Sequence, residues 1–102
     1  MVKLKNNIEY IEYIKNKMLS IFNNIIVLDY YIEQTDGRFG VYFLYNTDKI
    51  LISSTRGYIG LDIYRKEKCI EINQFDEKLN NMILSVDSIN YHIEFLKEFY
   101  KN

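Results

Sequence analysis

Residues 25–73 contain short runs rich in Ile, Val, Tyr, Phe and Thr that are separated by turn signals. Runs of this composition predict β-strands, here over residues 25–33, 39–46, 49–54, 58–65 and 68–73. Asp36-Gly37 and Arg56-Gly57 stand between runs and favour tight turns. Parallel neighbours would need crossovers of about a dozen residues or more. The pattern therefore predicts an antiparallel meander.

Alternation along each strand separates two faces of the predicted sheet. One face is almost wholly apolar and is predicted to form the core; it collects Ile26, Leu28, Tyr30, Ile32, Val41, Phe43, Ile50, Ile52, Ile59, Leu61, Ile63, Ile70 and Ile72. The other face, which receives Val27 by the same alternation, mixes aromatic side chains with carboxylates and has one lysine, Lys49. We expect that second face to be open to solvent.

Both segments that flank the strands have apolar residues at helical spacing. Residues 4–22 predict an amphipathic helix with Asn6 or Asn7 as its cap. Residues 75–100 carry an apolar seam that predicts a long helix starting near Gln74, with a break at residues 85–88 left open. Packing both helices on the apolar sheet face gives an α+β fold: helix, five-stranded antiparallel meander, helix.

Length, composition and charge narrow the class of protein. A chain of 102 residues with 48% hydrophobic and 26% charged residues predicts one folded domain over residues 1–102. The formal net charge of −1 argues against a nucleic-acid partner, which needs clustered Lys and Arg. The single cysteine excludes an intrachain disulfide and fits a reducing compartment. The sequence has neither a signal-like nor a membrane-spanning apolar run, so we expect a cytoplasmic protein without membrane contact.

Candidate catalytic groups are few. Cys69 and His92 are the one thiol and the one imidazole, and neither lies in a Gly-rich elbow, so we read them as a partly buried structural thiol and a surface histidine. One Cys and one His also fall short of the usual zinc ligand sets. Residues 53–57 have hydroxyls and an arginine but lack the lysine of a phosphate-binding loop. We expect no enzyme, no metal and no cofactor.

Tyrosine is the residue type that points to a function. The chain has ten tyrosines, and several fall on the predicted open face beside carboxylates. Tyrosine offers a large, rigid contact area with a polar tip, which suits protein interfaces. Cross-strand stacking that stabilises an exposed sheet is the alternative explanation. The candidate partner-binding residues are Asp29, Tyr31, Glu33, Tyr42, Tyr58, Asp62, Tyr64 and Glu71.

In size, predicted layout and surface character, the chain resembles the small immunity proteins of bacterial toxin systems, including those of contact-dependent growth inhibition. The resemblance implies a protein that binds and blocks a cognate toxin, often a basic nuclease. Tyr42, Tyr58 and Tyr64 would anchor the toxin, and the four carboxylates would match its basic residues. A dimeric secretion or folding chaperone and a homodimeric structural protein are the alternatives, and they leave a homodimer open.

Overall fold

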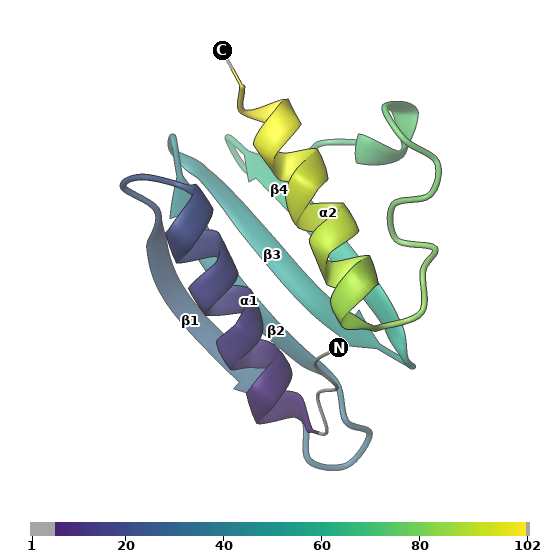
Figure 1. Cartoon of the computed structure of the whole chain (residues 1–102). Helices are drawn as coiled ribbons and strands as arrows, with labels where there is room; N and C mark the ends of the chain where they lie inside the picture. The colour runs from purple at the N-terminus through teal and green to yellow at the C-terminus, as the bar shows by residue number, and fades with distance from the viewer. Residues whose placement is uncertain (1–5, 102) are drawn as a thin grey trace.

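A five-stranded antiparallel sheet forms one layer of the protein, and two helices form the other (Figure 1). The computed structural model describes residues 6–101. The strands are neighbours in chain order, which confirms the predicted α+β meander; they are β1 (Ile26–Ile32), β2 (Phe39–Tyr45), β3 (Asp48–Thr55), β4 (Tyr58–Arg65) and β5 (Lys68–Cys69).

Two-residue turns join the strands from β2 to β5. Asn46-Thr47, Arg56-Gly57 and Lys66-Glu67 all have positive φ angles, between 50° and 82°. Positive φ at both central residues gives a turn whose twist matches that of the strands it joins. The β-branched Thr47 at φ 68° adopts this geometry at a cost of about 1–3 kcal/mol, which the flanking strand pairing must offset.

The first helix, α1 (Asn7–Ile21), starts at the predicted cap: the side chain of Asn6 accepts a hydrogen bond from the backbone N–H of Glu9. It buries Ile11, Ile14 and Met18 against the sheet. The second helix, α2 (Val86–Phe99), begins with a capping box and buries Ile89, Ile93 and Leu96. Figure 1 shows both helices on the same face of the sheet, as predicted.

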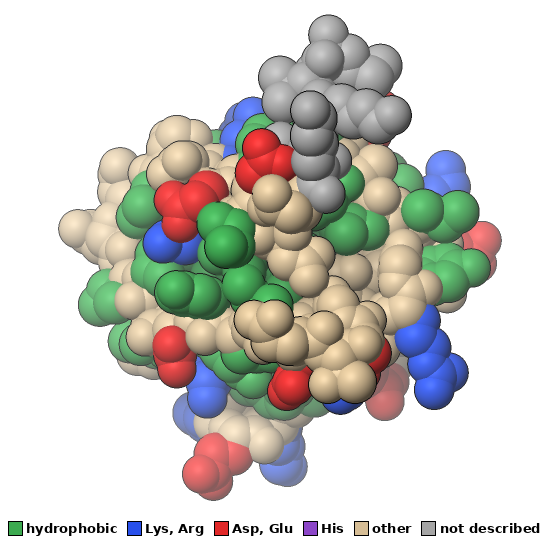
Figure 2. Space-filling view, turned by 90° about the horizontal axis from the view of Figure 1, so that it is seen from below, with side chains coloured by type: hydrophobic (Ala, Val, Ile, Leu, Met, Phe, Trp, Pro, Cys, Tyr) green, Lys and Arg blue, Asp and Glu red, His purple; other side chains and the backbone are tan. Residues whose placement is uncertain are grey.

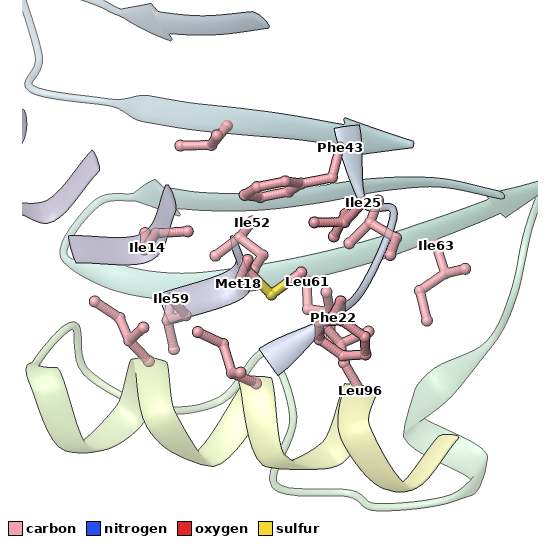
Figure 3. Close-up of a cluster of buried hydrophobic side chains, with 14 of the residues drawn as sticks. Ile14, Met18, Phe22, Ile25, Phe43, Ile52, Ile59, Leu61, Ile63 and Leu96 are labelled. Atoms are coloured by element: carbon pink, nitrogen blue, oxygen red, sulfur yellow. The ribbon is translucent and has the colours of Figure 1, made fainter. Parts of the chain in front are cut away.

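The core lies between these two layers. Figure 3 shows Met18 of α1, Leu61 of β4 and Leu96 of α2 in one cluster, and none of the three is exposed. Phe39, Val41 and Phe43 of β2 are equally buried. Each fully buried side chain of this size contributes about 1.5–3 kcal/mol. The apolar face of β2, β3 and β4 is therefore the core face, as the alternation predicted.

Only the second half of the predicted long C-terminal helix is helical in the structure. Residues 72–74 form a single 3-10 turn, and the chain then runs irregularly until α2 begins at Val86. Local hydrogen bonds compete with helix here: Asp76 accepts from Lys78 N, and Asn80 has a φ of 66°. Phe75, which the seam placed in the core, is 64% exposed. The last strand, β5, is also shorter than predicted: it ends at Cys69, whereas the prediction extended to Asn73.

The face prediction was wrong at the start of β1. Val27 pairs with Phe43, yet Asp29 pairs with Tyr42, so the register shifts between them. Such a bulge inserts one extra residue and reverses the alternation on either side of it. Val27 accordingly faces the helices, while Ile26, predicted to be core, is 53% exposed.

Two further predicted core residues of β1 are half exposed, Leu28 at 46% and Tyr30 at 52%. Leu28 is the residue that the bulge inserts between the two registers. Tyr30 lies on the helix face but at its margin, with Lys15 Nζ of α1 5.6 Å from its ring centroid. β1 is an outer strand of the sheet, so in the part of the chain that the structure describes it has a neighbouring strand on one side only.

The irregular segment between the 3-10 turn and α2 covers the outer edge of β4. Ile59 N donates to Met82 O at 3.0 Å, and Leu84 N donates to Gly57 O at 2.8 Å. Between these bonds and β5, the side-chain amide of Asn80 accepts from Leu61 N and donates to Leu61 O. One side chain thus replaces a peptide group of a neighbouring strand.

His92 holds Asn80 in this position. Its Nε2 accepts the backbone N–H of Asn80 at 3.0 Å, and its Nδ1 lies 2.8 Å from Ser88 O. These contacts fix the neutral tautomer with the proton on Nδ1. Burial lowers the pKa of His92. The imidazole is therefore a structural link between α2 and the segment that covers β4.

Candidate binding face

A set of tyrosines and carboxylates lies on the sheet face opposite the helices. Cross-strand pairs align them: Asp29 lies opposite Tyr42, Tyr42 opposite Leu51, and Leu51 opposite Asp62. Tyr31 and Tyr64 share this face through the alternation of β1 and β4. We call these residues the tyrosine face: Asp29, Tyr31, Tyr42, Leu51, Asp62 and Tyr64.

Tyr31 is held across β2. Its ring lies over Gly40, where a Cβ atom would be 2.8 Å from Cζ of the tyrosine, so only glycine leaves room for it. The ring centroid of Tyr31 is 6.2 Å from that of Tyr42, and Lys49 Nζ is 5.0 Å from the Tyr42 centroid on the other side. Such aromatic and cation–π contacts each contribute about 0.5–1.5 kcal/mol. The two tyrosines form a preset aromatic surface.

Asp62 is the unusual charge on this face. Burial raises the pKa of its carboxyl group, and the Cys69 thiol, 3.9 Å from Oδ1, only partly opposes that shift. Among residues 6–101 no lysine or arginine forms an ion pair with Asp62. Its charge in turn raises the pKa of the neighbouring Tyr64. Asp62 is thus a poorly solvated carboxylate without a cation.

A shallow groove of about 630 Å³ borders the tyrosine face between β4 and residues 69–74. Asp62 and Glu71 are its charged lining residues, and Asn73, Gln74 and Asn80 add side-chain amides. Glu71 accepts a hydrogen bond from Gln74 Nε2 at 2.7 Å. Hydrogen-bond acceptors therefore concentrate at this end of the face.

Two predicted site residues lie apart from the others. Glu33 follows β1 in the exposed connection to β2. Tyr58 starts β4 opposite Thr55 and is 51% exposed. Across residues 6–101, the one ring contact between tyrosines of the predicted set joins Tyr31 and Tyr42. The predicted surface is therefore a compact centre with Glu33 and Tyr58 at its far end.

The expected environments of Cys69 and His92 were reversed. Cys69 is exposed, whereas His92 is fully buried, and both of its ring nitrogens are engaged by Asn80 and Ser88. Burial and the charge of Asp62 raise the pKa of the thiol, the opposite of what an activated nucleophile requires. These two residues do not form a thiol–imidazole pair.

Within the described residues, no cluster of three or more His, Cys, Asp or Glu side chains is arranged to hold a metal ion. Over the same residues, neither helix is long and apolar enough to cross a membrane. On the side of the molecule that Figure 2 shows, acidic and basic side chains are interspersed around apolar ones.

Sequence reasoning missed Asn80 and Gly40 as residues that shape the face. Asn80 lines the groove and pairs with β4, but a single asparagine in a polar loop gives no signal of that role. Gly40 interrupts an otherwise aromatic and β-branched run, and a glycine inside a strand indicates close approach of another group. That signal was available in the sequence.

No protein-family model matches this chain, and the searches of curated proteins and of solved structures found no match.

Proposed function

We propose that this protein is a non-catalytic, cytoplasmic binding protein of the immunity type, which neutralises a cognate bacterial toxin by covering a basic surface of it with the tyrosine face. The observation that carries the proposal is Asp62, whose carboxyl pKa is raised by burial and which has no cationic partner within residues 6–101. A lysine or arginine from a toxin would provide that partner.

The energetics favour a charged partner at this position. A carboxylate that is already half desolvated has lost part of its hydration before binding, so pairing it with a cation costs less than pairing a fully hydrated one. Close interfacial charge pairs of this kind can couple by about 1.5 kcal/mol or more. Asp62 therefore stabilises a complex with a basic protein more than it stabilises the free protein.

The tyrosines contribute contact area at low entropic cost. Tyr31 and Tyr42 already touch each other, with Tyr31 fixed over Gly40, so binding would immobilise few new torsions. Rigid aromatic side chains in the centre of a surface are typical anchors of protein complexes. Glu33, Tyr58, Tyr64 and Glu71 would extend the contact around this centre.

A chaperone or homodimer function is the second candidate, and the outer edge of β1 favours it. Ile26, Leu28 and Tyr30 are each about half exposed along a strand that, within residues 6–101, has a neighbouring strand on one side only. An open strand edge with apolar side chains can accept an extended client segment or a second copy. In that case the tyrosine face would be a stabilising surface without a toxin partner.

The test is co-expression with the product of the adjacent gene, followed by mass determination of the purified complex and titration of variants. Asp62→Asn should weaken a one-to-one complex with a basic toxin domain about tenfold or more. The same substitution should leave the free protein equally or more stable, because the amide removes a charge that burial disfavours. Glu94→Gln, on the exposed side of α2, is the matched control and should change neither quantity.

Carboxyl chemical shifts provide a second readout. The pKa of Asp62 should fall from its raised value when the partner binds, since a nearby cation favours the ionised form. Recovery of the protein only as a dimer, or bound to an extended client through β1, would replace the toxin proposal with the second candidate. A complex unaffected by both Asp62→Asn and Tyr42→Ala would show that another surface binds.

A further inference from the structure

A second groove, with basic instead of acidic lining residues, adjoins the groove that contains Asp62. Its volume is about 500 Å³, and Cys69 and Ile70 line both grooves. Among the described residues no carboxylate lines it; the lining residues are Arg65, Lys66, Lys68, Cys69, Ile70, Phe75 and Phe99. We call it the basic cleft.

Aromatic side chains form one wall of the basic cleft. The ring centroid of Phe75 lies 5.8 Å from that of Phe99 and 6.3 Å from that of Phe95. These contacts hold the ring in place, yet Phe75 is 64% exposed. A fixed, exposed phenylalanine leaves apolar area for a ligand to cover without first ordering the side chain.

Arg65 lines the basic cleft beside Phe99. Its guanidinium donates to both carboxylate oxygens of Asp48, at 2.9 and 2.7 Å, and its Cζ lies 5.8 Å from the Phe99 ring centroid. The bidentate pair fixes the side chain and compensates its charge. Arg65 therefore shapes the cleft without providing a free cation.

Lys66 and Lys68 provide the free charge. Lys66 lies in the turn between β4 and β5, and Lys68 is the first residue of β5; both are exposed, and neither forms an ion pair within residues 6–101. The turn holds Lys66 at φ 51°, which fixes the backbone that carries it. The cleft thus combines an aromatic wall with two unpaired ammonium groups.

We propose that the basic cleft binds an acidic segment of another protein in which an aromatic or large aliphatic side chain adjoins Asp or Glu. The apolar side chain would pack on Phe75 and Phe99, and the carboxylates would meet Lys66 and Lys68. This inference is independent of the toxin proposal, because it uses neither the tyrosine face nor Asp62.

Two other occupants fit less well. Attraction to an anionic membrane would contribute about 1 kcal/mol of binding free energy for each lysine near its surface. That is too little to hold a protein whose net charge is −1. A second copy seated on the same cleft would bring the unpaired lysines of both copies together. An acidic segment is the occupant that complements both the charge and the apolar wall.

The test is an NMR titration of the whole protein with the peptide acetyl-Asp-Glu-Phe-Asp-Glu-amide. Amide shifts should concentrate at residues 65–70, 75 and 95–99. The double variant Lys66→Glu/Lys68→Glu and the single variant Phe75→Ser should each weaken binding about tenfold or more. Lys17→Glu/Arg56→Glu changes the net charge equally at sites on α1 and the β3–β4 turn, and should bind as the parent does.

Several outcomes would overturn the proposal. These are the absence of shifts at millimolar peptide, shifts confined to the tyrosine face, and equal weakening by the two double variants, which would indicate unspecific charge attraction. Equal binding of a peptide with Gly in place of Phe would exclude the aromatic wall. Binding to phosphatidylserine-containing vesicles, lost in the Lys66→Glu/Lys68→Glu variant and without peptide binding, would assign the cleft to a membrane surface.

Discussion

The four long strands, β1 to β4, form a sheet whose two edges are protected in different ways. The edge of β4 is covered by the protein's own chain: β5 pairs with its end, Asn80 with its middle and residues 82–84 with its start. The edge of β1 has no strand beside it within residues 6–101. Residues far apart in the chain cover the edge of β4, whereas the edge of β1 is protected by residues of β1 itself.

The local chemistry at β1 has two parts. The bulge between Val27 and Asp29 interrupts the regular backbone geometry, and the Asp29 carboxylate accepts a hydrogen bond from Tyr30 N at 2.8 Å. Bulges and charges on outer strands are common protections against edge-to-edge pairing. In this protein, β5, Asn80 and residues 82–84 cover the edge of β4, whereas the edge of β1 carries a bulge and a carboxylate.

The largest loss of stability should come from truncating Leu79, whose side chain anchors the irregular segment between the 3-10 turn and α2 that covers the edge of β4. Leu79 is fully buried, so Leu79→Ala should lower the free energy of unfolding by about 2–5 kcal/mol. Urea denaturation measures this loss. Ile83→Ala, at a side chain that is 70% exposed, is the control and should cost less than about 0.5 kcal/mol. Equal losses in the two variants would contradict the assignment of Leu79 as the anchor.

Asn80→Ala should have the next largest effect, because it leaves both backbone groups of Leu61 without their partner. Unpaired polar groups at this depth cost about 1–3 kcal/mol. The amide proton of Leu61 should then exchange faster with solvent, while amides inside the β2–β3 ladder keep their protection. Unchanged exchange at Leu61 would show that the side chain is not needed to close this edge.

Acidification should weaken the same edge through His92. Burial lowers the pKa of this imidazole in the folded protein, so the unfolded chain binds more protons as the pH falls below about 6.5. Its contribution to stability is complete above that pH and is lost progressively below it. Protonated Nε2 could no longer accept the N–H of Asn80.

Denaturation at about pH 7.5 and pH 5.5 measures this dependence, and His92→Gln should flatten it. Asp62 contributes with the opposite sign, because its raised pKa makes the folded protein bind a proton more readily on acidification. The charge of Asp76 also acts on His92, by favouring its protonated form. The comparison is therefore made in the Asp62→Asn background, where a flat profile in the presence of His92 would contradict the prediction.

The smallest effect on stability is expected at the other edge. Asp29 is exposed, so Asp29→Ala should change the free energy of unfolding by a few tenths of a kcal/mol. Its visible consequence should be self-association, since Tyr30 N loses its acceptor and the edge loses a charge. Sedimentation at increasing concentration detects this, with Asp87→Ala on α2 as the control. A variant that sediments as the parent does at every concentration would show that the bulge alone protects the edge.

Most of the sheet could be predicted from the sequence because β2, β3 and β4 are rich in strand-forming residues, place apolar side chains at alternate positions of the core face and are joined by short turns. The error in β1 arose where Ile26, Val27 and Leu28 are all apolar, so that alternation cannot reveal which of them faces the core. In the C-terminal segment, the seam from Phe75 to Leu79 and Met82 matched a helix, but polar contacts of Asp76 and Asn80 decided otherwise. Periodicity detects apolar spacing and does not detect such contacts.

The candidate site was predictable to a similar degree. Alternation alone placed Tyr31, Tyr42, Asp62 and Tyr64 on one face, and the register of the strands agrees. Alternation could not show that Asp62 has no ion-pair partner within residues 6–101, or that Arg65 and Phe75 line a common groove. Each of these features depends on residues far apart in the chain. His92 was placed at the surface because its partners Asn80 and Ser88 form hydrogen bonds that no spacing rule reports.

The placement of both helices on one sheet face has a consequence for synthesis on the ribosome. The strands and α1 leave the exit tunnel first, while α2, which supplies Ile89, Ile93 and Leu96, is translated after all of them. Until then the nascent chain displays an apolar half-face that only α1 can shield, and such intermediates are prone to aggregate. We therefore expect the fold to be completed only after α2 has been translated, and chaperones to matter most while a slow or stalled ribosome delays α2.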